Sequence, residues 1–194
     1  MGLAFYSSTA NIRDAINKLN RLHGTNSNSI SGIIHGNGST SGNDTIEKAV
    51  QWAVNIANDN SHGYNQYDTR EGHEDHGRQG PDYDCSSLVS NAWAEAGVGV
   101  SRDDATYTMM DDYLANGFTW HAGNPAASEL QRGDVLLNIQ NHTAMYLGDN
   151  LIVEAYINEF GDICNGEIGD QTGEEIHTTQ FYSFPWDGYL RYGE

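Results

Sequence analysis

The chain changes its periodicity once, from helical spacing in its middle part to strand-like runs in its last third. Apolar residues recur at three- and four-residue steps over residues 46–57 and 88–96, which predicts two amphipathic helices. Short runs rich in β-branched and aromatic residues follow at 135–139, 143–147 and 151–157, with a Gly-Asp-Asn turn signal between the last two. Helices followed by hairpin-connected strands predict an α+β domain with a small antiparallel sheet.

Two weaker patterns complete the expected domain. Residues 103–116 predict a further helix that ends at Gly117, and residues 189–192 predict a strand at the edge of the sheet. The buried face of that helix is expected to consist of Met109, Met110, Tyr113 and Leu114.

The first 43 residues differ in composition from the rest of the chain. Residues 9–23 predict a short amphipathic helix, and residues 24–43 are rich in Gly, Ser, Asn and Thr, as is typical of a flexible linker. Asp44 then opens a capping-box pattern that ends at Glu47. We therefore expect an N-terminal helix and linker over 1–43 and a catalytic domain over 44–194, with neither a secretory signal nor a membrane span.

The charge of the chain limits its partners. It carries 27 Asp and Glu against 9 Lys and Arg, a formal net charge of −18. Such an acidic surface repels nucleic acid phosphate and anionic membranes, so neither is expected as a partner.

Cys85 lies directly before the helical stripe of residues 88–96, and so at a helix N-terminus. The free backbone N–H groups and the dipole at such an end stabilise a thiolate and a developing oxyanion, which makes Cys85 a candidate nucleophile. The alternative is a small buried cysteine that packs under the helix. Cys164 is the second cysteine, and we do not expect the two to form a disulfide, because that would block the nucleophile.

The predicted sheet supplies partners for the cysteine. His142 begins the second predicted strand, and Glu154 follows twelve residues later on the third. A hairpin can bring these positions together, so that the imidazole takes the thiol proton while the carboxylate orients the ring. From spacing alone, His142 could equally be a structural residue and Glu154 a solvent-facing one.

Metal binding is not expected. Residues 72–77 contain His73 and His76 with Glu74 and Asp75, but no second cluster at zinc spacing accompanies them, so a solvated polar loop is predicted. Acidic residues also crowd residues 162–175 without the spacing of a twelve-residue calcium loop. No cofactor is therefore predicted.

Four short blocks occur in one order along the chain. They are Tyr-Asp-Cys-Ser-Ser-Leu-Val at 83–89, Arg-Gly-Asp-Val-Leu-Leu at 132–137, Asn-His-Thr-Ala-Met-Tyr-Leu-Gly at 141–148 and Leu-Ile-Val-Glu-Ala at 151–155. Together they resemble the NlpC-type and CHAP-type cysteine peptidoglycan hydrolases, and most of all the phage or prophage endolysin domains with a Tyr-Asp-Cys-Ser-Ser motif. The resemblance covers about residues 44–192.

The resemblance implies a papain-like fold, with the cysteine at a helix N-terminus packed on a small antiparallel sheet. It also implies that Cys85 is the nucleophile, His142 the general base and Glu154 the residue that orients the histidine. The positions that it places at the substrate site are Tyr64, Asp84, Ser86 and Ser87, the last of which replaces a common glycine.

The expected function is hydrolysis of an amide bond in the stem peptide of peptidoglycan through a thioester. We expect an endopeptidase at the bacterial cell wall, within a phage-type lysin, a virion or a secreted assembly that has further domains. The alternatives are an N-acetylmuramoyl-L-alanine amidase of the same fold, a transferase or deamidase, and a non-catalytic wall-binding or tail module.

Overall fold

The computed structural model describes residues 42–73 and 76–194. Three α-helices and one short 3-10 helix accompany a single six-stranded antiparallel sheet in this part of the chain. The helices are α2 (Gly42–Ala57), α3 (Cys85–Glu95), α4 (Thr106–Ala115) and η1 (Ala127–Glu129). The strands are β1 (Phe118–Ala122), β2 (Val135–Asn138), β3 (His142–Gly148), β4 (Leu151–Ala155), β5 (Ile176–Gln180) and β6 (Gly188–Tyr192). The predicted α+β class is confirmed.

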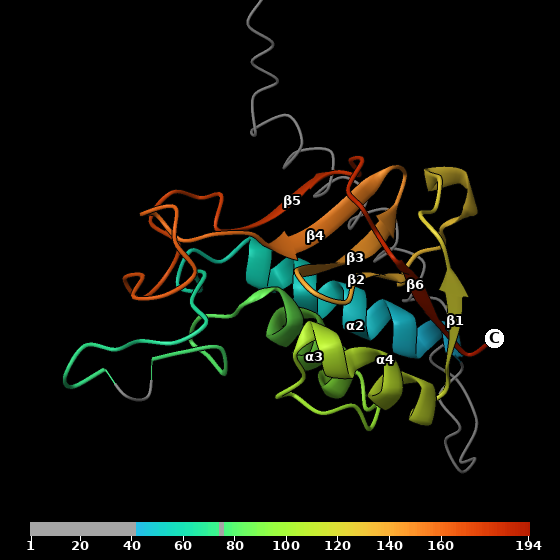
Figure 1. The fold of residues 1–194 in the computed structure, drawn as a ribbon, viewed down its shortest axis with the longest axis horizontal. Helices are drawn as coiled ribbons and strands as arrows, with labels where there is room; N and C mark the ends of the chain where they lie inside the picture. Colours follow the sequence, from blue (N-terminus) through green and yellow to red (C-terminus); the bar gives the residue numbers. More distant parts are fainter. Residues whose placement is uncertain (1–41, 74–75) are drawn as a thin grey trace, which may run out of the picture. The chain divides into compact units, whose positions relative to one another are not determined.

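The strands lie in the order β1-β6-β2-β3-β4-β5, and α2, α3 and α4 lie below this sheet in Figure 1. The three predicted strands of the last third are present as β2, β3 and β4. The prediction of an edge strand at 189–192 was wrong in position, because β6 pairs with β1 on one side and with β2 on the other. The two edge strands, β1 and β5, were not predicted.

The sheet buries side chains on both faces. Leu136, Ala144, Tyr146 and Ile152 alternate along β2, β3 and β4 and form a core with Leu130 and Trp186. The segment after β5 covers this core with aromatic side chains, namely Phe181, Tyr182 and Phe184. Residues between these positions, such as Val135, Met145 and Val153, are also completely buried. Because both faces are covered, the central strands contain almost continuous apolar runs.

Aromatic rings join α3 and α4 to the β1–β6 edge. Trp93 of α3 meets Phe118 of β1 edge-on with the ring centroids 4.8 Å apart, and Tyr113 of α4 lies 4.6 Å from Phe118. The predicted buried face of α4 is only half right. Met109 and Tyr113 are fully buried, whereas Met110 is partly exposed and Leu114 is 44% exposed, because their positions on the helix point away from β1.

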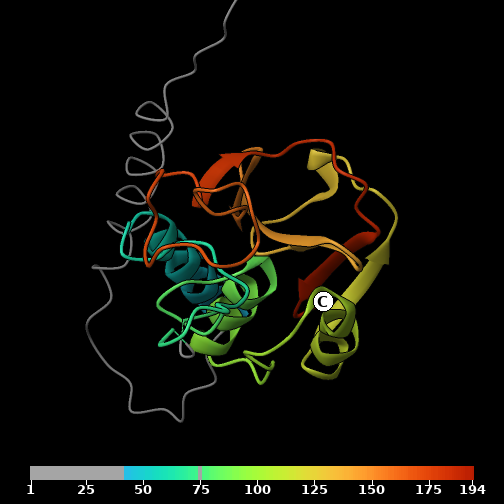
Figure 2. The ribbon, with the colours of Figure 1, turned by 60° about the vertical axis from the view of Figure 1, so that its left-hand side comes forward.

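Two long loops before α3 and after β4 lie against each other (Figures 1 and 2). Asp82 joins them: its Oδ1 accepts hydrogen bonds from the backbone N–H of Gly63 at 2.6 Å and of Gly169 at 3.0 Å. Gly63 and Gly169 approach so closely that a Cβ on Gly63 would lie 2.2 Å from the Gly169 carbonyl oxygen. Asp82 therefore fixes the loop that leads into Cys85.

The predicted N-terminal helix and linker fall on residues that the structure leaves out, apart from Gly42 and Asn43, which already belong to α2. The first described helix starts two residues before the predicted domain boundary. Within residues 42–73 and 76–194, no helix combines the length and the apolar character needed to cross a membrane.

Replacing Asp82 by Ala is expected to destabilise the domain by at least about 3 kcal/mol, because three buried donors lose their acceptor. These are the two backbone N–H groups and Nε2 of His76, which lies 2.5 Å from Asp82 Oδ2. Urea unfolding measures the change. Asp111→Asn, at an exposed position of α4, is the control, and an equally stable Asp82→Ala variant would contradict the assignment.

Candidate active site

Cys85 is the first residue of α3, and the helix cap around it is closed by side chains. Asp84 caps the helix: its Oδ1 accepts from the Ser87 N–H at 2.7 Å, while the Asp84 N–H donates to Ser87 Oγ at 2.9 Å. Cys85 itself is 5% exposed. Because it stands at the first helical position, its own N–H has no acceptor within the helix.

His142 and Glu154 are brought together by the hairpin of β3 and β4. The turn between the strands contains Asp149 and Asn150, both with positive φ, which is the conformation that this sequence signal predicts. His142 Nε2 lies 2.7 Å from Glu154 Oε2, and both residues are buried. The hydrogen bond at Nε2 leaves Nδ1 of the ring as the nitrogen for the thiol.

The pKa values of this pair are shifted in opposite directions. Burial acts to lower the pKa of His142, but the side chains of Cys85 and Glu154 outweigh it and raise the pKa from 6.5 to about 9. Burial acts to raise the pKa of Glu154, but hydrogen bonds from His142 and His177 lower it from 4.5 to about 2. At neutral pH the site therefore holds an imidazolium next to a carboxylate.

The residues expected at the substrate site lie close to Cys85, but most of them are already hydrogen-bonded within the protein. Asp84 Oδ1 also accepts from Ser86 Oγ at 3.0 Å, and Arg78 lies 3.2 Å from Asp84 Oδ2. Ser87 is completely buried, so the expectation that its side chain binds substrate needs correction. Its hydroxyl holds the Asp84 N–H, which is a role in helix capping.

Tyr64 lies on the loop before α3 and is 3% exposed. Its hydroxyl accepts a hydrogen bond from Gln66 Nε2 at 3.3 Å. Burial raises the pKa of Tyr64 above its ordinary range, and the charges of Cys85 and Asp84 add to the effect. A neutral phenol thus stands close to the thiol, at the position where the sequence places a wall of the substrate site.

The histidine-rich loop does contain a group of ligand-type atoms. Asp68, His73 and His76 present one such atom each, and all three lie within 4.8 Å of one another. However, Arg70 Nη2 donates to Asp68 Oδ2 at 2.6 Å, and Arg70 holds the pKa of Asp68 well below its usual range. His76 is also paired with Asp82. The arrangement is that of a closed ion-pair network, and the prediction of no metal stays a prediction.

Two residues next to Glu154 were missed in the sequence. His177 Nε2 lies 3.3 Å from Glu154 Oε1, and Tyr182 Oη donates to Glu154 Oε2 at 2.8 Å. His177 belongs to β5, where Glu154 is its direct cross-strand partner. The β-branched residues of Ile176-His-Thr-Thr-Gln180 could have signalled this strand, but Ile176 is its only apolar residue and no alternation is present, so the signal is weak.

Both cysteines are free, so the disulfide between Cys85 and Cys164 is absent, as expected.

Comparison with known families agrees with this geometry. The model of the NlpC/P60 family matches residues 72–165, a range that includes Cys85, His142 and Glu154. This central stretch of the chain is similar to the NlpC/P60 family. An endolysin-like domain also matches residues 152–194, which include His177 and Tyr182. The papain-like arrangement of a cysteine-bearing helix against an antiparallel sheet is that of NlpC/P60 proteins, which are cysteine peptidases that act on peptidoglycan.

Several solved structures resemble the chain at low identity. The P60 domain of an antigen from M. avium subspecies paratuberculosis is 17% identical, with a TM-score of 0.47 over 79% of this chain and 97% of that one. The peptidoglycan hydrolase RipB from Mycobacterium tuberculosis is 18% identical, with a TM-score of 0.46 over 95% and 85%. An NlpC/P60 family protein from Bacillus cereus is 17% identical, with a TM-score of 0.41 over 80% and 41%. A comparison with curated protein sequences finds no significant match.

Replacing Glu154 by Gln is expected to lower the pKa of His142 from about 9 by one unit or more, because the carboxylate that stabilises the imidazolium is lost. Histidine ring signals followed by NMR from pH 5 to 10 measure the change. Glu95→Gln, on the exposed side of α3, is expected to leave the pKa of His142 unaltered. An unchanged His142 titration in Glu154→Gln would show that the two side chains are not coupled.

Proposed function

We propose that this NlpC/P60 domain cleaves an amide bond in the stem peptide of peptidoglycan, with Cys85, His142 and Glu154 as its catalytic residues. The observation that carries the proposal is the buried 2.7 Å contact between His142 and Glu154, together with the side-chain hydrogen bond by which Cys85 raises the pKa of His142. The family and endolysin-like matches support peptidoglycan as the substrate and the bacterial cell wall as the place of action.

The first half of the reaction forms a thioester. Before the substrate binds, the proton of the Cys85 thiol already resides on His142 Nδ1, and Cys85 Sγ attacks the carbonyl carbon of the scissile amide. The oxyanion that develops is stabilised at the N-terminus of α3, where backbone N–H groups have no acceptor within the helix. His142 then gives its proton to the departing nitrogen as the carbon–nitrogen bond breaks, and the amine leaves.

The second half regenerates the enzyme. His142, now neutral, takes a proton from a water molecule, whose oxygen attacks the thioester carbon. The carbon–sulfur bond breaks, the proton returns to sulfur, and the carboxylic acid product leaves. Glu154 stays ionised throughout, because its pKa of about 2 lies far below the working pH. Its role is to hold the imidazole in the tautomer that faces the thiol.

The bond that is cut is proposed to lie within the stem peptide, which makes the domain an endopeptidase of a phage or prophage lysin. Cleavage of the muramoyl–L-alanine bond by an amidase releases different ends. Mass spectrometry of purified peptidoglycan after digestion identifies the new termini: a free amino group within the peptide supports the endopeptidase, and an intact stem peptide without its sugar supports the amidase. Walls that remain intact after prolonged incubation would exclude both.

Replacing Cys85 by Ala is expected to reduce the release of soluble wall fragments by at least about a thousandfold while preserving the melting temperature, because the reaction loses its nucleophile. A turbidity assay on purified walls measures the loss. Cys164→Ala removes the other free thiol, and this partly exposed position lies outside the proposed mechanism, so full activity is expected. Undiminished lysis by Cys85→Ala would refute the assignment.

The rate of alkylation by iodoacetamide distinguishes a catalytic domain from a wall-binding module that has the same fold but no activity. An activated Cys85 is expected to react at pH 6, because a thiol at a helix N-terminus beside a histidine is more reactive than an ordinary thiol. Peptide mapping locates the label, and Cys164 provides the internal reference for an ordinary thiol. A Cys85 that reacts no faster than Cys164 at this pH would favour the non-catalytic module.

A further inference from the structure

Glu154 serves more than one histidine. Its carboxylate is buried and receives three side-chain contacts, from His142 Nε2 at 2.7 Å, Tyr182 Oη at 2.8 Å and His177 Nε2 at 3.3 Å. Two of them fall on Oε2, and the contact with His177 falls on Oε1. The catalytic mechanism above uses only the first.

The second histidine has acceptors at both ring nitrogens. His177 Nδ1 lies against the backbone carbonyl oxygen of Glu174, and Nε2 lies against the Glu154 carboxylate. A carbonyl oxygen only accepts hydrogen bonds, so Nδ1 must carry a proton. If Nε2 were unprotonated, its lone pair would face the negative Oε1 of Glu154 and be repelled by it. A proton on Nε2 is therefore favoured as well. The geometry is thus that of an imidazolium.

The charges around His177 favour the same state. Burial acts to lower the pKa of His177, but the contacts with Glu154 and Glu174 outweigh it and raise the pKa. The Glu174 carboxylate lies 3.6 Å from Nδ1. The other titratable side chains that face the pair are Tyr156, whose ring centroid is 6.0 Å from that of His177, together with Tyr182 and His142 on the two sides of Oε2.

We propose that His177 is a cationic positioning residue, which holds Glu154 through Oε1 so that Oε2 points at His142, and which limits the negative charge that His142 experiences. This inference rests on the proposed function of Cys85 and His142. A Glu154 carboxylate without this counter-charge holds the proton on His142 more tightly. His142 must release that proton to the leaving amine, and an imidazolium that is too weak an acid transfers it slowly.

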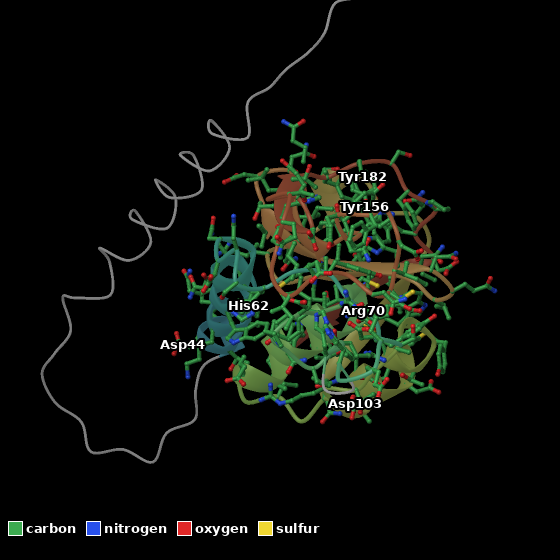
Figure 3. All side chains as sticks on the ribbon, turned by 90° about the vertical axis from the view of Figure 1, so that its left-hand side faces the viewer. Asp44, His62, Arg70, Asp103, Tyr156 and Tyr182 are labelled. Carbon is green, nitrogen blue, oxygen red and sulfur yellow. The ribbon has the colours of Figure 1, made fainter. Side chains whose placement is uncertain are left out.

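The surroundings of His177 allow it to exchange protons with solvent. A cavity of about 270 Å³ is lined by Glu154, Tyr156, His177, Thr179 and Tyr182, and neither Cys85 nor His142 is among its lining residues. Tyr156 and Tyr182 lie together on this side of the molecule (Figure 3), and Tyr156 is 56% exposed. His177 therefore lines a cavity beside exposed Tyr156, apart from Cys85 and His142.

NMR of the wild-type protein tests the charge directly. In ¹⁵N-histidine-labelled protein at pH 7, both ring nitrogens of His177 are expected to show the chemical shifts of protonated nitrogens. A neutral ring with one unprotonated nitrogen would overturn the proposal. This readout needs no activity, so it remains decisive even if Cys85 proves not to be the nucleophile, which the Cys85→Ala assay reports separately.

His177→Gln tests the effect on catalysis. The amide can still donate to Glu154 but carries no charge, so the pKa of His142 and the alkaline limb of the kcat/KM profile are both expected to move up by about one pH unit. His121→Gln is the matched control, because His121 is also paired with a carboxylate, that of Glu194, but lies on edge strand β1. A His142 titration that is identical in His177→Gln and the wild type would overturn the proposal.

Discussion

The carboxylate of Glu154 is buried in a protein whose formal net charge is −18, and it remains ionised because separate segments of the chain supply donors to it. His142 comes from β3, His177 from β5 and Tyr182 from the segment that follows β5. An unpaired carboxylate in this place would cost several kcal/mol. The position of the His142 ring therefore depends on the register in which β3, β4 and β5 pair.

The other half of the site depends on how the N-terminus of α3 is held. Asp84 and Ser87 form two reciprocal hydrogen bonds across the first turn of the helix. Asp82, in the preceding loop, accepts hydrogen bonds from the backbone of Gly63 and Gly169. These buried contacts leave little freedom to the backbone on which Cys85 stands. The helix N-terminus thus supplies a fixed, partly positive environment for the sulfur, while the sheet supplies the proposed base.

Much of the fold could be predicted from the sequence, because the apolar residues of several helices and strands recur at regular spacing. The helices α2 and α3 and the strands β2 to β4 have apolar positions that recur with the period of their structure. The edge strands β1 and β5 were missed because each has only one strand neighbour and half-exposed side chains, so polar residues such as His177 and Gln180 interrupt the apolar pattern. β6 was expected at the edge because its pairing with β1 joins residues far apart in the chain, which no local pattern shows.

The sequence by itself determined the class of fold, the place of Cys85 at a helix N-terminus and the pairing of His142 with Glu154, because a cap and a hairpin are local and their spacing along the chain is short. Only the tertiary structure decided that Ser87 is buried within the cap, and that His177 and Tyr182 share the Glu154 carboxylate. These contacts depend on how β5 and the segment after it return to β4, across a long loop whose path is set by packing and by Asp82. No local pattern encodes such a return.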